Sequence, residues 1–151
     1  MPLKPSQINT YLLFKLPSAF LCGVRLRSIS EANCTTTVRY RWINQNPFKS
    51  MFWAVQGMAA ELSTGALVMS YIKERDASVS MLVANNKGSF SKKAKGKITF
   101  TCNDGLKIKQ AIDKTLSTGE GVTCWMHSEG LNAQGEQVSS FDFEWTVKRK
   151  N

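Results

Sequence analysis

The sequence predicts an α+β domain in which a curved antiparallel β-sheet wraps around one long buried helix. Residues 50–72 contain a single charged residue, Glu61, in an otherwise apolar or small-residue run. A helix that is apolar nearly all round is buried. Most segments after it alternate apolar and polar residues, which is typical of half-buried strands. A sheet that covers the helix buries both apolar surfaces at once.

The segments before the long helix are predicted to be a broken helix and two strands. Residues 6–20 place apolar side chains at helical spacing, and Pro17 predicts a kink or break there. Residues 24–29 and 35–43 alternate and are rich in β-branched and aromatic residues, which favours strands. A loop follows at 44–47, where Asn46 or Pro47 is placed to start the long helix.

The segments after the long helix predict three strands, a surface helix and a hairpin. The strands are expected at 78–84, 88–93 and 97–102, and the helix at 106–116, stopped by Gly119 and Gly121. Residues 121–131 and 136–148 alternate on either side of a turn that contains Gly135. We therefore expect one domain over 1–151, with 1–21 as an N-terminal helical segment packed on it.

Composition narrows the class of protein. The four cysteines are far apart and form no CxxC pair, which favours reduced thiols in the cytoplasm, and no signal-peptide pattern is recognised at the N-terminus. His127 is the only histidine, so no metal site is expected. Residues 50–72 are long enough to cross a membrane, but their polar residues and Glu61 favour a core helix over a transmembrane segment.

The net charge of +9 suggests an anionic partner, and solvated surface charge explains it equally well. No nucleic-acid motif frames the basic residues, so no specific nucleic-acid partner is expected. The lone carboxylate of Glu61 is the sharpest functional signal. An unpartnered carboxylate in an apolar helix is costly, and such a cost often marks a site. The structural alternative is a carboxylate held by a salt bridge or by a dimer partner.

The order and spacing of several short motifs resemble the hot-dog fold acyl-CoA thioesterases, and the resemblance covers nearly the whole chain. Within that superfamily the sequence resembles the phenylacetate-degradation type in particular, and it resembles an uncharacterised thioesterase-like branch more closely still. The motifs are Pro17 followed by Gly23-Val-Arg-Leu, Asn46, Ser50-Met-Phe, Glu61 fifteen residues after Asn46, Phe90-Ser-Lys-Lys-Ala-Lys-Gly-Lys, and the final hairpin.

The resemblance implies a hot-dog domain that forms a homodimer or a dimer of dimers, with the site at the interface. It implies Glu61 as acid/base or nucleophile and Asn46 as the residue that orients water or substrate. Backbone N–H groups at the helix N-terminus would hold the thioester oxygen. The substrate would be an acyl-CoA or another acyl thioester, with no cofactor beyond the coenzyme A of the substrate. Asn46 acting only as a helix cap is the alternative for that residue.

The expected substrate-binding residues are those beside the start of the helix and in the basic loop. They are Met51, Phe52, Trp53, Met58, Phe90, Lys92 and Lys93. Core packing is the competing interpretation for the first four, and an exposed charged loop is the competing interpretation for the lysines.

The chain departs from the family pattern at one place. Many such enzymes have His-Gly where this sequence has Phe52-Trp53. The departure favours a non-catalytic acyl- or lipid-binding protein as the alternative function, and net charge alone favours a polyanion-binding protein. A hot-dog dehydratase is a weaker alternative, since no histidine lies near the helix.

Overall fold

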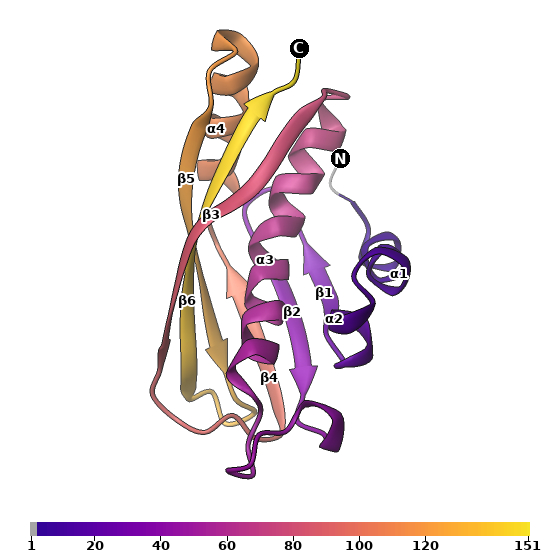
Figure 1. Cartoon of the computed structure of the whole chain (residues 1–151), viewed down its shortest axis with the longest axis vertical. Coiled ribbons are helices and arrows are strands. Elements are labelled where there is room, and N and C mark those ends of the chain that lie inside the picture. The colour runs from indigo at the N-terminus through magenta and orange to yellow at the C-terminus, as the bar shows by residue number, and fades with distance from the viewer. Residues whose placement is uncertain (1–2) are drawn as a thin grey trace.

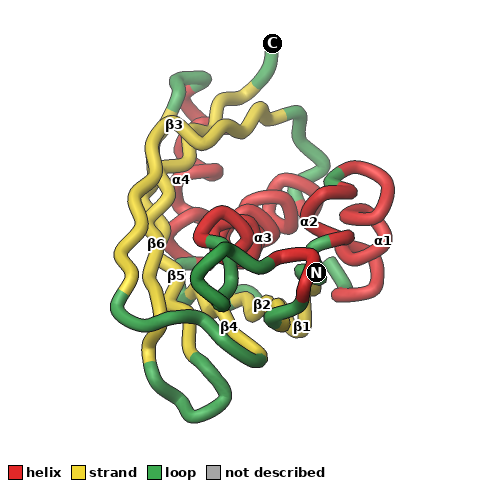
Figure 2. Tube along the Cα trace, turned by 60° about the horizontal axis from the view of Figure 1, so that its bottom comes forward, coloured by secondary structure: helices red, strands yellow, loops and turns green. Residues whose placement is uncertain are grey.

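The computed structural model describes residues 3–151. Its six strands form one antiparallel sheet in the order β1-β2-β4-β5-β6-β3, which curves around the long helix α3 (Figures 1 and 2). This is the hot-dog arrangement, so the predicted fold is confirmed. The elements in chain order are α1 (Pro5–Lys15), α2 (Pro17–Leu21), β1 (Arg25–Ile29), β2 (Cys34–Arg39), the 3-10 turn η1 (Trp42–Asn44), α3 (Trp53–Glu74), β3 (Val79–Phe90), β4 (Lys97–Cys102), α4 (Gly105–Thr118), β5 (Val122–Leu131) and β6 (Gln137–Arg149).

Most predicted boundaries hold, and three differ. The strand expected at 35–43 ends at Arg39, because residues 42–44 turn into η1. The strands expected at 78–84 and 88–93 are one strand, β3, because β6 pairs with it along its whole length and a bulge at 83–85 absorbs the irregularity. The long helix begins at Trp53, so the prediction that Asn46 or Pro47 starts it is wrong.

The buried face of α3 is fixed on the sheet by hydrogen bonds as well as by apolar contacts. Thr36 Oγ1 on β2 donates to the carbonyl of Ala59 at 2.7 Å, and Trp145 Nε1 on β6 donates to Thr64 Oγ1 at 2.9 Å. A Cβ on Gly65 would lie 3.1 Å from the Trp145 ring, so the helix approaches β6 closely there. Because these buried polar groups are paired, they set the rotation of the helix without an unpaired-group penalty.

The sheet covers only part of the circumference of α3. A stripe along the helix stays open, with Glu61 and Trp53 exposed and Met58 and Met69 half-buried. The expectation that the helix is buried all round is therefore wrong for the single chain. The apolar run predicted burial all round, but the open stripe lies between the flanking elements, which Figure 2 shows as α1 on one side and the β3–β6 part of the sheet on the other.

The two edge strands of the sheet, β1 and β3, differ in their surroundings. At the β1 edge, the Asn9 amide on α1 donates to the carbonyl of Leu26 at 3.0 Å and accepts from its N–H at 2.8 Å. This pair occupies backbone groups that an edge strand otherwise presents to other chains. Strand β3 forms the opposite edge and is twelve residues long.

Within residues 3–151, no helix is both long and apolar enough to span a membrane.

Candidate functional site

A groove of about 610 Å³ lies at the N-terminal end of α3, between the loop before the helix and the loop after β3. It brings together seven of the nine predicted site residues, and it leaves out Glu61 and Met58. The seven are Asn46, Met51, Phe52, Trp53, Phe90, Lys92 and Lys93; the other lining residues are Pro47, Phe48, Ser50, Gln56 and Ala94.

Asn46 organises the loop that forms one wall of the groove. Its Oδ1 accepts hydrogen bonds from the N–H of Phe48 at 2.9 Å and of Ser50 at 3.2 Å. Its Nδ2 donates to the carbonyl of Met51 at 3.3 Å. The helix cap is Phe52 instead, with no side-chain cap bond. The capping interpretation of Asn46 is therefore wrong, and its amide shapes the groove through the loop.

The start of α3 is anchored by backbone contacts and left open to the groove. Met51 N–H donates to the carbonyl of Ala94 at 2.9 Å, and Phe52 N–H donates to that of Asn44 at 2.9 Å. The N–H groups of Val55 and Gln56 bond to the Phe52 carbonyl, and no side chain of the N-cap residue caps the two N–H groups before them, those of Trp53 and Ala54. The positive end of the helix dipole lies at this end of the molecule. Such an end favours developing negative charge.

The aromatic residues at the helix start are exposed and are not core residues. Phe52 is 44% exposed and Trp53 is 57% exposed, and their rings meet edge to face at 5.9 Å between centroids. Phe90 is half exposed on the opposite wall. Core packing, the alternative for Met51, holds for that residue, which is almost fully buried while still lining the groove.

Gln56 is a site residue that sequence analysis missed. Its side chain lines the groove with only 4% of the residue exposed, and its Nε2 donates to the carbonyl of Met51 at 3.3 Å. Its Oε1 is buried without a hydrogen-bond partner within residues 3–151. A buried acceptor without a partner is costly, which marks a place where a donor can bind. The only sequence signal was a polar residue in an apolar run.

The two lysines are exposed, and each has a contact within the protein. Lys92 Nζ lies 2.6 Å from Glu136 Oε2, and Lys93 Nζ donates to the carbonyl of Phe48 at 3.2 Å. Lys93 thus ties the two loops of the groove together. Both ammonium groups sit at the rim of an apolar groove, where an anionic part of a ligand would meet them.

Glu61 lies eight residues beyond Trp53, which is about 12 Å along the helix axis. Its carboxylate faces the open stripe, and no ion pair or side-chain hydrogen bond to it occurs among the described residues. Desolvation by the surrounding protein still raises the pKa of Glu61. A raised pKa makes the carboxylate a stronger base than an ordinary glutamate.

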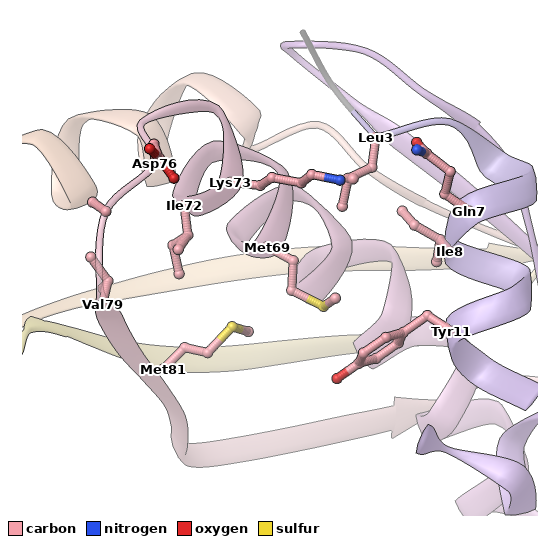
Figure 3. Close-up of a pocket in the computed structure, with 11 residues that line it drawn as sticks. Leu3, Gln7, Ile8, Tyr11, Met69, Ile72, Lys73, Asp76, Val79 and Met81 are labelled. Atoms are coloured by element: carbon pink, nitrogen blue, oxygen red, sulfur yellow. The ribbon is translucent and has the colours of Figure 1, made fainter. Parts of the chain in front are cut away.

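A second hollow of about 440 Å³ lies at the other end of the open stripe (Figure 3). Tyr11 on α1, Met69 on α3 and Met81 on β3 point toward it from three elements. It shares no lining residue with the groove. The open stripe therefore carries the groove at one end, Glu61 in its middle and this hollow at the other end.

The lone histidine lies away from the groove. His127 is on β5, with Nδ1 2.8 Å from Asp142 Oδ1 and Nε2 3.4 Å from Glu129 Oε1. It lies beside none of the groove residues, so it offers no acid–base group there. The described residues contain no group of three or more side chains suited to hold a metal ion.

Comparison with solved structures gives close matches of fold at low sequence identity. A Pseudomonas aeruginosa protein of unknown function, PA5026, described as a probable thioesterase, is 20% identical, with a TM-score of 0.82 over 99% of both chains. The protein OLEI01261 of unknown function from Chlorobaculum tepidum TLS is 15% identical, with a TM-score of 0.82 over 98% of both. Thioesterase HI1161 from Haemophilus influenzae is 10% identical, with a TM-score of 0.75 over 99% of this chain and 93% of that one.

At these identities the matches establish the fold. No curated protein sequence matches the chain. One family model matches almost its whole length, from residue 6 to residue 147. The chain therefore belongs to the family defined by that model, the domain of unknown function DUF4442.

Proposed function

We propose that this protein hydrolyses acyl thioesters, with coenzyme A as the thiol carrier. The observation that carries the proposal is the apolar groove that ends at the uncapped N-terminus of α3, with lysines at its rim. Solved structures described as a probable thioesterase and a thioesterase share the fold and lend it support. The four free cysteines are compatible with work in a reducing cytoplasm.

The groove divides into parts with different roles in this proposal. Phe52, Trp53 and Phe90 contact the acyl chain, since acyl pockets are mostly apolar. The first N–H groups of α3 hold the thioester oxygen as it becomes an oxyanion. Lys92 and Lys93 meet the phosphates of the carrier. Asn46 holds the loop, and Met58 on the half-buried side of the stripe extends the apolar wall.

Glu61 supplies the acid–base chemistry. Its carboxylate takes a proton from a water molecule, whose oxygen attacks the thioester carbonyl carbon. The tetrahedral intermediate then collapses, the carbon–sulfur bond breaks, and the proton passes from Glu61 to the leaving thiolate. In the other form of the mechanism Glu61 attacks directly, and water hydrolyses the resulting mixed anhydride. Gln56 Oε1 is the acceptor available to orient the attacking water.

The proposal requires a second copy of the chain, because Glu61 does not line the groove of its own protomer. Strand β3 is an edge strand with Leu82 and Phe90 exposed, and the adjacent stripe of α3 is open. A two-fold dimer that pairs the β3 edges covers both surfaces. In the dimer that we propose, Glu61 of one protomer acts at the groove of its partner, and two such dimers can associate further.

The first test is thiol release from short, medium, long and aromatic acyl-CoAs. Glu61→Gln is expected to lower kcat by at least 100-fold for the preferred substrate, as loss of a general base does. Its stability is expected to change little, since the side chain is exposed. Glu120→Gln, on an exposed turn after α4, is the matched control and is expected to keep full activity. Equal activity of wild type and Glu61→Gln would overturn the assigned role.

A mixing experiment tests whether the site is shared between protomers. Glu61→Gln and Gln56→Leu proteins are unfolded, mixed and refolded together. If the two residues act across the interface, a mixed dimer contains one intact site, and activity returns above that of either variant alone. No recovery, or a monomer by sedimentation, would contradict a shared site.

A non-catalytic acyl-binding protein is the second candidate. Trp53 favours it, because a large exposed side chain stands at the first helical position beside the oxyanion site. Absence of turnover with every acyl-CoA, in a protein that still binds one of them, would establish that function instead. Trp53→Ala then weakens acyl binding without creating activity.

A further inference from the structure

A compact pocket of about 190 Å³ on the outer face of the sheet contains five cationic side chains. They come from β1, β2, β4 and the residue before η1: Arg25, Arg27, Arg39, Arg41 and Lys97. Strand alternation directs them outward, since Leu26 between Arg25 and Arg27 is buried in the core. The register then completes the cluster, because Arg39 pairs with Lys97 across β2 and β4.

We call the pocket lined by these five cations the arginine pocket. No carboxylate lines it. The other lining residues are Gly23 and Thr37, and no ion pair to any of the five occurs within residues 3–151. Burial, and then the charges of Arg41 and Arg27, lower the pKa of Arg25. Cations crowded together without a counter-ion repel one another, and a bound anion relieves that repulsion.

Two of the guanidinium groups are held in place before any ligand arrives. Arg25 Nη1 donates to the carbonyls of Phe20 and Val24, each at 2.8 Å, and its guanidinium lies 3.6 Å from the centre of the Phe20 ring. Arg27 Nε donates to Thr37 Oγ1 at 2.8 Å. Each guanidinium keeps further N–H groups for a ligand. Fixed guanidinium groups bind phosphate oxygens in pairs at a low cost in conformational entropy.

We propose that the arginine pocket is a binding site for a small anion that carries two or more phosphate groups, such as the diphosphate of a nucleotide. The size of the pocket admits a compact anion and no acyl chain. Five converging cations exceed what one phosphate needs. The convergence on one hollow also distinguishes it from the broad basic face that binds a nucleic-acid strand.

This site is separate from the groove. The arginine pocket lies on the face of the sheet opposite α3 and shares no lining residue with the groove. The proposal therefore does not depend on thioester hydrolysis. The diphosphate has two possible sources, a free nucleotide or the nucleotide end of a coenzyme A molecule, and the experiment separates them.

The test is calorimetric titration with pyrophosphate, ADP, 3′,5′-ADP and coenzyme A at low salt. The Arg39→Gln/Arg41→Gln double variant is expected to weaken pyrophosphate and ADP binding at least tenfold, since both side chains are exposed and their loss spares the fold. The control is Lys114→Gln/Lys150→Gln, which removes the same charge from exposed positions outside the pocket and is expected to change affinity less than twofold. Melting temperatures verify that both variants fold.

The outcomes are distinct. Selective loss in the arginine variant supports the site. Equal binding of ADP and coenzyme A then assigns a free nucleotide, and tighter binding of coenzyme A that Arg39→Gln/Arg41→Gln weakens assigns its nucleotide end. Equal weakening in both double variants would show charge attraction alone and overturn the proposal. Absence of pyrophosphate and ADP binding, including the case in which only single-stranded DNA binds with steep salt dependence, overturns it as well.

Discussion

The two ends of α3 contain similar residues but are held in opposite ways. Toward its C-terminal end, Leu67 and Val68 are fully buried, and Tyr71 donates its hydroxyl to the carbonyl of Glu31 at 2.7 Å. Toward its N-terminal end, Trp53 is exposed, and the side-chain acceptor of Gln56 has no partner among residues 3–151.

The β1–β2 turn that accepts the hydrogen bond of Tyr71 also packs closely against α4. A Cβ on Gly105 of α4 would lie 2.0 Å from the Glu31 carbonyl oxygen, so the turn between β1 and β2 meets α4 backbone to backbone. At the start of α3, by contrast, the groove is open and Trp53 is exposed. We infer that the C-terminal end of the helix contributes stability and that the N-terminal end is kept available for a ligand.

The difference between the two ends is tested most directly by truncating one large side chain at each end. Leu67→Ala is expected to lower the free energy of unfolding by about 3 kcal/mol, the usual cost of a cavity at a fully buried leucine. Trp53→Ala is expected to change it by less than about 1 kcal/mol, because Trp53 is largely exposed. Urea denaturation measures both.

The same two variants are expected to affect KM in the reverse order. Folded Leu67→Ala keeps the wild-type KM for an acyl-CoA, and Trp53→Ala raises it. If both variants lost stability equally and neither affected KM, the division of α3 into a stabilising end and a binding end would be wrong.

Gln56 tests whether polarity at the N-terminal end serves the ligand or the fold. Gln56→Leu is expected to lower kcat/KM about tenfold, the effect of losing one well-placed hydrogen bond to water or substrate. Unfolding measurements are expected to show no loss of stability, since the variant removes a buried acceptor without a partner. The carbonyl of Met51 keeps its bond from Asn46 Nδ2.

The control for this variant is Gln110→Leu on the exposed face of α4. It makes the same chemical change outside the groove and is expected to leave kcat/KM unchanged. A destabilised Gln56→Leu protein with normal kcat/KM would assign Gln56 to the fold.

What the sequence predicts correctly rests on local signals. Alternation and the apolar run at 50–72 predict the sheet and the central helix, because each signal lies within one element. Seven predicted site residues meet in the groove, because they come from just two segments, 46–53 and 90–93, at one end of the molecule.

What the sequence missed depends on contacts between distant segments. The long helix was expected to be buried all round, because an apolar run does not reveal how far the sheet wraps around it. The arginine pocket was missed, because Lys97 joins Arg39 only through the register of β2 and β4. The lone acceptor of Gln56 is visible only when every neighbour is placed.

Glu61 and His127 both have raised pKa values, for opposite reasons. The stability change that follows from His127 is the smallest effect that we expect. Desolvation raises the pKa of Glu61 by disfavouring its charged form. For His127, burial lowers the pKa, but the hydrogen bonds and charges of Asp142 and Glu129 together raise it by favouring the charged form. The charged Glu61 carboxylate therefore lowers the free energy of unfolding at neutral pH, and the charged His127 imidazole raises it at low pH.

The pH dependences follow from these signs. The stability from His127 is fully present below its ordinary pKa of about 6.5 and is lost as pH rises through the raised value. Asp142→Asn is thus expected to lower the unfolding free energy at pH 5.5 by less than about 1 kcal/mol, since the pair is partly exposed, and by less at pH 9.

Turnover depends on Glu61 instead, because a base must be ionised. The acidic limb of kcat/KM then lies above the ordinary range of glutamate and stays in place in Asp142→Asn. A limb that moved with Asp142→Asn would assign the titration to His127 and remove Glu61 from the role of base.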